Sequence, residues 1–204
     1  MSSSKGKFIV IEGIDGCGGE TQSKKFAKYL RAKDVIVRTL SYPDYKGPIG
    51  EVINNYLHKK YNFSKEVQFL LYFSDFLKDK DKINKWLGEG TTIIADRYFS
   101  STMAYQCLNG VSADTALNAS KLFDLPRPDL IILLNISPET SMARKKKEKG
   151  NKLDRNEENK KLLRELADFY KQLAQRQALA KWVVIDGERS IDEVFKDLKK
   201  AIGV

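Results

Sequence analysis

Residues 13–22 read Gly13-Ile14-Asp15-Gly16-Cys17-Gly18-Gly19-Glu20-Thr21-Gln22, a turn rich in glycine. The apolar, β-branched run before it, residues 8–11, predicts a buried strand, and helical periodicity follows from Thr21. In this context the backbone N–H groups of such a turn and the N-terminus of the next helix bind phosphate. A purely structural turn is the alternative, but the flanking strand and helix favour a phosphate-binding loop (P-loop) in an α/β protein.

Two positions of this loop depart from the usual G-x-x-x-x-G-K-[ST] pattern. The framing glycines fall at Gly13 and Gly18, but Gly19 stands in place of the lysine and Glu20 in place of the hydroxyl residue. Gly19 supplies neither charge nor reach, and the Glu20 carboxylate either binds a cation or repels phosphate. We therefore expect weakened phosphate binding. Cys17 is expected to be a small filler rather than a nucleophile, because direct phosphoryl transfer needs no covalent step.

Composition indicates a cytosolic globular protein. The 204 residues, 42% hydrophobic and 31% charged, suit one α/β domain spanning residues 1–204. No apolar run approaches the roughly 20 residues that span a bilayer, the segment from Met1 to Lys7 lacks the apolar core of a secretory signal, and two cysteines make no disulfide framework. We therefore expect a cytoplasmic location and no membrane partner.

The net charge of +9 has three possible origins: a solvated lysine-rich surface, a nucleic-acid surface or a site for several phosphates. Lysines are spread along the whole chain, and the one dense cluster, residues 144–152, contains no aromatic residue. A stacking platform for single strands is therefore not indicated. We expect no nucleic-acid partner.

Apolar runs alternate with helical stretches along the whole chain. Strands are predicted at Phe8–Glu12, Val35–Leu40, Thr91–Asp96, Leu130–Asn135 and Trp182–Asp186. Helices are predicted at Thr21–Ala32, Ile49–His58, Lys65–Leu87, Ser101–Leu108, Ala113–Phe123, Pro138–Lys146, Glu157–Ala178 and Ile191–Ile202, with a mobile polar loop at Glu148–Asn156. Strands joined by helical crossovers predict a parallel five-stranded sheet covered by helices on both faces.

A second group of candidate residues closes the third predicted strand. The Asp96 carboxylate would face the ligand crevice at the carboxyl end of the sheet, and the Arg97 guanidinium suits a phosphate. An ion pair at the strand end is the structural alternative. Asp15, inside the loop, suggests a metal or a sugar hydroxyl, or simply a capping hydrogen bond. The basic run from Arg144 to Lys152 is either a solvated helix face or a cationic lid that stabilises a transferring phosphoryl group.

With these residues in place, the chain resembles the thymidylate kinase family, P-loop enzymes that phosphorylate dTMP with ATP. The likeness covers nearly the whole chain, and its most specific part is the pattern D-R-Y-x-x-S-x-x-A-Y-Q from Asp96 to Gln106. The other matching segments are Glu12-Gly13-Ile14-Asp15-Gly16, Thr21-Gln22, Tyr42-Pro43-Asp44-Tyr45, Leu70-Leu71-Tyr72-Phe73-Ser74-Asp75, Pro128-Asp129-Leu130, Asp154-Arg155-Asn156-Glu157 and 186–191. The resemblance implies the three-layer P-loop NTPase fold, with a short lid at approximately residues 144–156.

The resemblance also implies roles for individual residues, with ATP as co-substrate and Mg²⁺ as the metal. ATP would be bound by Gly13, Ile14, Asp15, Gly16, Cys17, Gly18, Gly19, Glu20 and Thr21. The dTMP pocket would contain Asp15, Tyr45, Tyr72, Arg97, Ser101, Thr102, Tyr105 and Gln106, with Tyr72 stacked on thymine and Arg97 on the acceptor phosphate. Catalytic roles would fall to Asp15, Asp96, Arg97, Arg144 and Arg155, metal binding to Asp15 and Asp96. Arg144 is alternatively an adenine neighbour, and a homodimer is implied.

Four departures from the family pattern qualify this implication. Gly19 and Glu20 bring ATP phosphate and metal handling into question, Tyr45 replaces an arginine near the acceptor phosphate, and Phe76 replaces one that hydrogen-bonds the base. Loss of one transition-state donor lowers rates by on the order of 10²–10³. We therefore expect a nucleoside monophosphate kinase acting on dTMP, with a catalytically weakened or inactive nucleotide-binding relative as the alternative.

Overall fold

The computed structural model describes residues 6–150 and 152–203. The expectation for the N-terminal segment therefore falls mostly outside the described residues, as does Asn151 of the expected loop. Five parallel strands form one sheet in the order β2-β3-β1-β4-β5. These strands are β1 (Phe8–Glu12), β2 (Val37–Ser41), β3 (Thr92–Asp96), β4 (Leu130–Asn135) and β5 (Lys181–Asp186).

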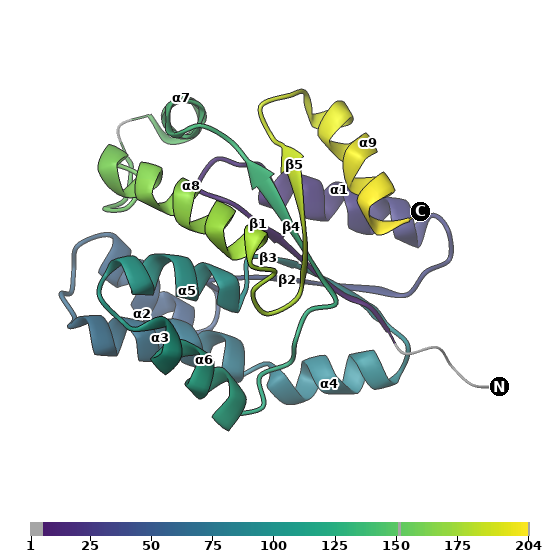
Figure 1. Ribbon diagram of the computed structural model, residues 1–204, viewed down its shortest axis with the longest axis horizontal. Helices are drawn as coiled ribbons and strands as arrows, with labels where there is room; N and C mark the ends of the chain where they lie inside the picture. Colours follow the sequence, from purple (N-terminus) through teal and green to yellow (C-terminus); the bar gives the residue numbers. More distant parts are fainter. Residues whose placement is uncertain (1–5, 151, 204) are drawn as a thin grey trace.

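Helices cover both faces of this sheet, as predicted (Figure 1). Helices α1 (Gly19–Arg31) and α9 (Ile191–Ile202) contact each other on one side, while α5 (Phe99–Leu108) and α8 (Lys160–Gln175) pack together on the other. The remaining helices are α2 (Pro48–Leu57), α3 (Lys65–Leu77), α4 (Lys80–Gly88), α6 (Ala113–Leu122) and α7 (Pro138–Lys149). Parallel strands require such crossover helices, so the alternating sequence pattern determined this architecture.

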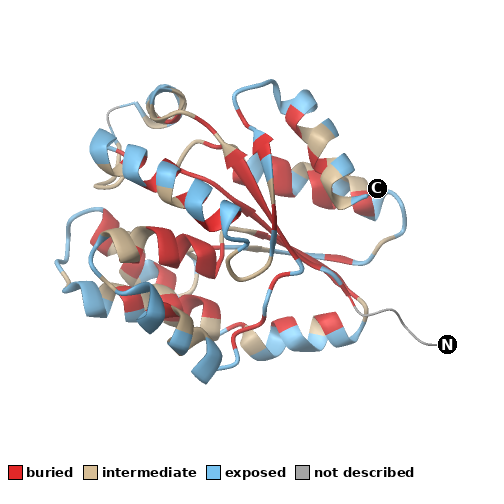
Figure 2. Ribbon diagram, viewed as in Figure 1, coloured by how far each residue is buried: buried red, intermediate tan, exposed pale blue. Residues whose placement is uncertain are grey.

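The core lies on both sides of the central strands. Every residue of β1 is buried, and β3 and β4 are buried except at their last residues (Figure 2). Central parallel strands are covered on both faces, which explains why their sequences are continuous apolar runs rather than alternating ones. The pairing of Ile11 with Asp96 and of Glu12 with Leu133 brings the carboxyl ends of three strands together. The P-loop and the Asp96–Arg97 segment therefore become neighbours.

The prediction of one helix over Lys65–Leu87 was wrong. The chain turns at Lys78 and Asp79, which separates α3 from α4. The Asp79 carboxylate accepts a hydrogen bond from the Tyr42 hydroxyl at 2.9 Å and one from Lys82 at 3.0 Å. This tertiary contact holds the turn, and neither glycine nor proline marks it in the sequence.

Two other boundaries differ from expectation around the lid. Helix α7 continues to Lys149 instead of ending at Lys146, and α8 begins at Lys160 instead of Glu157. The Asn159 side chain caps α8 by accepting a hydrogen bond from the Leu162 N–H at 3.0 Å. Asparagine is among the preferred N-cap residues, so this start was readable from the sequence. Among the described helices, none has both the length and the apolar character required to cross a membrane.

Candidate active site

The P-loop joins the buried end of β1 to the first turn of α1. Gly16 and Gly18 have φ angles of +77° and +94°, which favour glycine, and Gly18 is the N-cap of α1 without a capping side chain. The N-terminus of α1 thus carries unpaired N–H groups and a partial positive charge toward the cleft. Cys17 is buried, and burial raises the pKa of its thiol to about 12. A neutral thiol agrees with a filler role.

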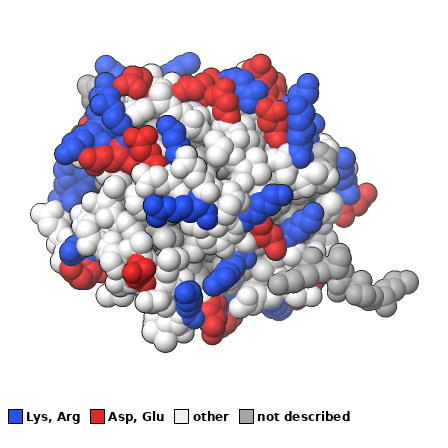
Figure 3. Space-filling model, in the orientation of Figure 1, with Lys and Arg blue, Asp and Glu red and all other residues white. Residues whose placement is uncertain are grey.

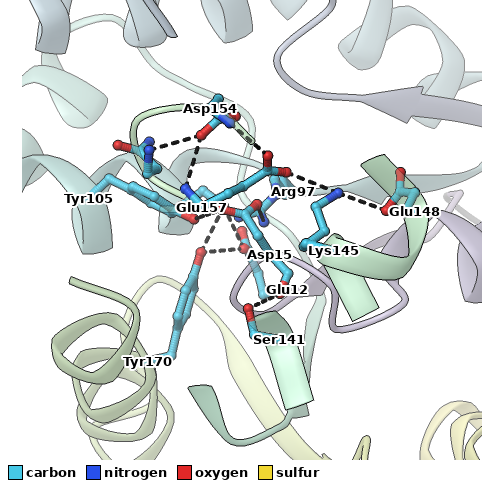
Figure 4. Close-up of polar contacts among 12 residues, drawn as sticks. Glu12, Asp15, Arg97, Tyr105, Ser141, Lys145, Glu148, Asp154, Glu157 and Tyr170 are labelled. Atoms are coloured by element: carbon cyan, nitrogen blue, oxygen red, sulfur yellow. Dashed lines mark hydrogen bonds and ion pairs between the residues drawn. The ribbon is translucent and has the colours of Figure 1, made fainter. Parts of the chain in front are cut away.

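Arg97 and Asp15 meet beside this loop. The Arg97 Nη2 donates to Asp15 Oδ1 at 2.7 Å, and the Tyr105 hydroxyl donates to Asp15 Oδ2 at 3.1 Å (Figure 4). Arg97 has a φ of +66°, an uncommon value for a non-glycine residue, and its backbone N–H bonds the Ile11 carbonyl at 2.9 Å. The end of β1 therefore holds Arg97 in a strained conformation that directs its guanidinium to the P-loop.

A buried carboxylate at the end of β1, Glu12, supports this arrangement. Its oxygens accept hydrogen bonds from the Tyr98 N–H (3.0 Å), the Ser101 hydroxyl (2.7 Å) and the Tyr170 hydroxyl (3.0 Å), and from the Ser100 hydroxyl (2.5 Å). Burial raises the pKa of Glu12, although Arg97 and the hydroxyl donors oppose that rise. The network ties α5 and α8 to β1. Tyr170 was missed by sequence reasoning because only the packing of α8 brings it here.

A pocket opens next to Arg97. All eight residues predicted for the dTMP pocket line it: Asp15, Tyr45, Tyr72, Arg97, Ser101, Thr102, Tyr105 and Gln106. Its remaining lining residues are Tyr42, Pro43, Leu57, Phe76, Asp154 and Asn156. Thr102 Oγ1 and Gln106 Oε1 are buried and have no hydrogen-bond partner among the described residues. Buried polar atoms are normally satisfied, so these two indicate a polar ligand in the pocket.

A larger cleft lies on the other side of Asp15 and Arg97. It is lined by residues 15–22 of the P-loop and the start of α1, by Asp96, and by the turn from Gly187 to Ile191 that the resemblance places next to adenine. Gly13 and Ile14, also predicted to bind ATP, form the turn behind it: Ile14 is buried, and a Cβ on Gly13 would lie 2.7 Å from the Leu134 carbonyl oxygen. Asp15 and Arg97 border both spaces, so the pocket and the cleft are adjacent.

Asp96 is the carboxylate best placed for a metal in this cleft. Burial raises the pKa of Asp96 to about 6. Repulsion from Glu12 and Glu20 adds to this rise, and the attraction of Arg97 opposes it. The described residues provide no group of three or more potential ligands for a metal ion. Mg²⁺ is commonly bound by one or two carboxylates together with substrate phosphates and water. Asp96 fits that role, whereas Asp15 is already engaged by Arg97 and Tyr105.

The missing lysine leaves room that Asp96 occupies. A Cβ on Gly19 would lie 2.3 Å from Asp96 Oδ1 and 3.7 Å from the Cys17 sulfur. The first distance is well below van der Waals contact, so any side chain at position 19 must displace the carboxylate. Gly19 therefore allows Asp96 to approach the first turn of α1 closely.

The two lid arginines lie in different places. Arg144 donates to the Gly16 carbonyl at 3.2 Å and to the Gly187 carbonyl at 2.9 Å, so it bridges the P-loop and the turn after β5. Arg155 lies over the Tyr56 ring, with 4.0 Å from its Cζ to the centroid, and donates to the Tyr61 carbonyl at 3.1 Å. The structure thus brings Arg144 to the P-loop but places Arg155 against α2.

Two lysines of the lid face the cleft beside Arg144. Lys145 and Lys149 line the cleft, and both pair with the buried carboxylate of Glu157. The basic run itself was visible in the sequence. Which of its members face the cleft depends on the rotation of α7, and no pattern in the sequence distinguishes Lys145 from its neighbours.

Comparisons with known proteins agree with this geometry. The family model described as "Thymidylate kinase" matches residues 11–198. The chain is 32% identical over 195 residues to a thymidylate kinase of Dictyostelium discoideum, covering 95% of this chain and 83% of that protein. It is 31% identical over 204 residues to one of Plasmodium falciparum, covering 97% and 90%.

A solved thymidylate kinase structure from Candida albicans superposes with a TM-score of 0.76 at 26% identity, and the match covers 98% of this chain and 92% of that one. This likeness and the five-stranded parallel sheet confirm the P-loop NTPase fold. The family model spans nearly all of the described chain, and both relatives exceed 30% identity. The chain therefore belongs to the thymidylate kinase family.

Proposed function

We propose that this protein transfers the γ-phosphoryl group of ATP to dTMP, giving dTDP for dTTP synthesis. The observation that carries the proposal is the pocket beside Arg97, which gathers all eight expected acceptor residues. Two buried polar atoms in it have no hydrogen-bond partner in the described part of the chain. A thymine base carries one N–H donor and two carbonyl acceptors. The Gln106 amide and the Thr102 hydroxyl complement that edge, while Tyr72 and Phe76 offer apolar surface to the ring.

Each side chain has a task in a direct in-line transfer. Arg97 pairs with the acceptor phosphate, one of whose oxygens attacks the γ-phosphorus as the bond to the ADP oxygen breaks. The P-loop N–H groups and Arg144 lie on the donor side, and Asp15 keeps Arg97 aligned between the two substrates. Asp96 would hold Mg²⁺, which would supply positive charge for the donor phosphates. Arg155 contributes through the lid, because its contacts with Tyr56 and Tyr61 attach that segment to α2.

The direct test is a coupled assay of ADP release with ATP, Mg²⁺ and individual monophosphates. We expect turnover with dTMP, and Arg97→Ala should lower kcat/KM at least about 10²-fold, because it removes a donor to the reacting phosphate. Exposed Arg127→Ala is the matched control and should leave turnover unchanged. Absence of turnover with every natural monophosphate at high enzyme concentration would contradict the proposal.

The second candidate is a nucleotide-binding relative with weak or no catalysis, favoured only by Gly19 and Glu20. It predicts dTMP binding without ADP release, and a gain of turnover in the double variant Gly19→Lys, Glu20→Thr. The same assay separates the two candidates, since wild-type turnover supports the kinase alone.

We further propose that residues 1–204 work as one domain in the cytoplasm, with approximately 144–156 as the lid. The free thiols of Cys17 and Cys107 are consistent with a reducing compartment. A homodimer is also proposed, and the exposed side chains of Val67 and Leu70 on α3 offer an apolar surface for it. Sedimentation of the purified protein tests the assembly, and a monomer at micromolar concentration would exclude a stable dimer.

A further inference from the structure

Helix α7 packs against the P-loop. The Ser141 hydroxyl donates to the Asp15 carbonyl at 2.6 Å, and Arg144 donates to the Gly16 carbonyl at 3.2 Å. A Cβ on Gly16 would lie only 3.1 Å from the Ser141 carbonyl oxygen, which shows how closely the two segments approach. Residues three and four apart share a helix face, so Lys145 lies on the face that meets the P-loop.

Lys145 borders the donor cleft together with Gly18 and Gly19. Its side chain is only 14% exposed, and its Nζ lies 3.1 Å from Glu157 Oε1 and 3.0 Å from Glu148 Oε2. Figure 4 shows Lys145 between these two carboxylates. The next two lysines, Lys146 and Lys147, are exposed. Lys145 is thus a mostly buried cation held at the edge of a phosphate-binding loop that has no lysine of its own.

Lys145 can leave Glu157 because this carboxylate has a second cationic partner. Glu157 is 3% exposed, and it also accepts two hydrogen bonds from Lys149, at 2.8 and 3.0 Å, and one from the Asp154 N–H at 3.0 Å. Removing the only partner of a buried charge is costly, but Glu157 retains Lys149 if Lys145 leaves. The other partner, Glu148, is 60% exposed, and such pairs contribute little.

We propose that Lys145 supplies the positive charge that Gly19 does not, by exchanging its ion pair with Glu157 for oxygens of the donor's polyphosphate. Lys149 remains as the counter-charge of Glu157. The ligand class is a nucleoside triphosphate or its polyphosphate part, and only the identity of that donor rests on the proposed function. Lys145 is therefore a phosphate-binding residue on α7, in place of one on the P-loop.

The test is calorimetric binding of ATP, and separately of inorganic tripolyphosphate, without an acceptor nucleotide. Lys145→Met should raise the Kd for both at least about tenfold, because it removes a charge-assisted contact to the phosphate oxygens. Lys147→Met is the matched control, with the same charge change on the exposed side of the helix, and should leave both Kd values unchanged. Thermal melts of both variants establish that they are folded.

A second variant leaves Lys145 in place and removes a competitor. Glu148→Gln should tighten tripolyphosphate binding up to about fivefold, because Lys145 then breaks one fewer surface ion pair when it binds the phosphate. Equal Kd values for Lys145→Met and Lys147→Met would overturn the proposal, as would a larger loss in Lys149→Met than in Lys145→Met. Binding that depends on Lys145 without any phosphoryl transfer would contradict the proposed function and leave this inference standing.

Discussion

At the scale of single residues, charged side chains of opposite sign hold one another in position in the site. Arg97 lies between the buried carboxylate of Glu12 and the carboxylate of Asp15, and its backbone is held by β1. Asp96 differs because no described side chain hydrogen-bonds it, and its pKa is raised by burial. Asp96 is partly buried at the end of β3, and burial of a carboxylate without a hydrogen-bonding side chain costs free energy in the ligand-free fold.

Asp96→Asn should therefore stabilise the ligand-free protein at alkaline pH. The folded-state pKa of about 6 lies above the ordinary 3.8, so the Asp96 contribution to stability is full below about pH 4 and is lost as pH rises through 6. At about pH 8 the variant should gain at most about 3 kcal/mol in free energy of unfolding, and near pH 5 about half of that. Urea unfolding at both pH values measures this. Asp114→Asn, at an exposed position on α6, is the control, and a gain independent of pH would contradict the assignment.

At the scale of elements, helix ends were predictable where the capping residues are local. Helix α9 runs from Ile191 to Ile202, as expected, because Ser190 and Glu193 form a capping box and Gly203 adopts a left-handed conformation at its end. The turn between α3 and α4 was not predictable, because the contact that holds it comes from Tyr42 on a distant segment. The residues of α5 that line the pocket were expected from the family resemblance, whereas the positions of Tyr170 and Lys145 depend on how α8 and α7 pack.

The end of α3 carries a prediction about stability. Lys78 lies 2.8 Å from Asp75 Oδ1, and this carboxylate is 1% exposed and also accepts the Asp44 N–H at 2.8 Å. Lys78→Met leaves Asp75 without its cation, so we expect a loss of about 2 kcal/mol in the free energy of unfolding. Lys85→Met, on the exposed side of α4, should change it by less than about 0.5 kcal/mol. Chemical denaturation compares the two, and equal losses would show that the pair does not stabilise α3.

At the scale of the whole molecule, the excess positive charge is dispersed. Figure 3 shows lysine and arginine side chains interspersed with aspartate and glutamate on one face, and many of them form ion pairs. On this face, carboxylates interrupt the basic side chains that give the net charge of +9, so the face offers no continuous basic track for a nucleic-acid backbone. The cleft is lined by as many acidic as basic side chains, and the lid residues Arg144 and Lys145 are among the basic ones.

We therefore expect no binding of duplex DNA at physiological salt. Fluorescence anisotropy of a labelled duplex should stay at the value of the free duplex at about 150 mM salt, and any binding at low salt should vanish steeply as salt is added. Tripolyphosphate should abolish residual low-salt binding only if the DNA enters the cleft. Salt-resistant binding would show that a nucleic-acid surface had been missed.

The close approach of Asp96 to Gly19 couples these two positions. With 2.3 Å between Asp96 Oδ1 and the position of a Cβ on residue 19, any side chain placed there would shift the carboxylate. Substitutions at neighbouring positions that share a contact are not additive, so the effect of Gly19→Lys depends on where the Asp96 side chain moves. A double-mutant cycle of Gly19→Lys and Asp96→Asn should therefore show a large interaction term, because the second change removes a charge that the new lysine would meet.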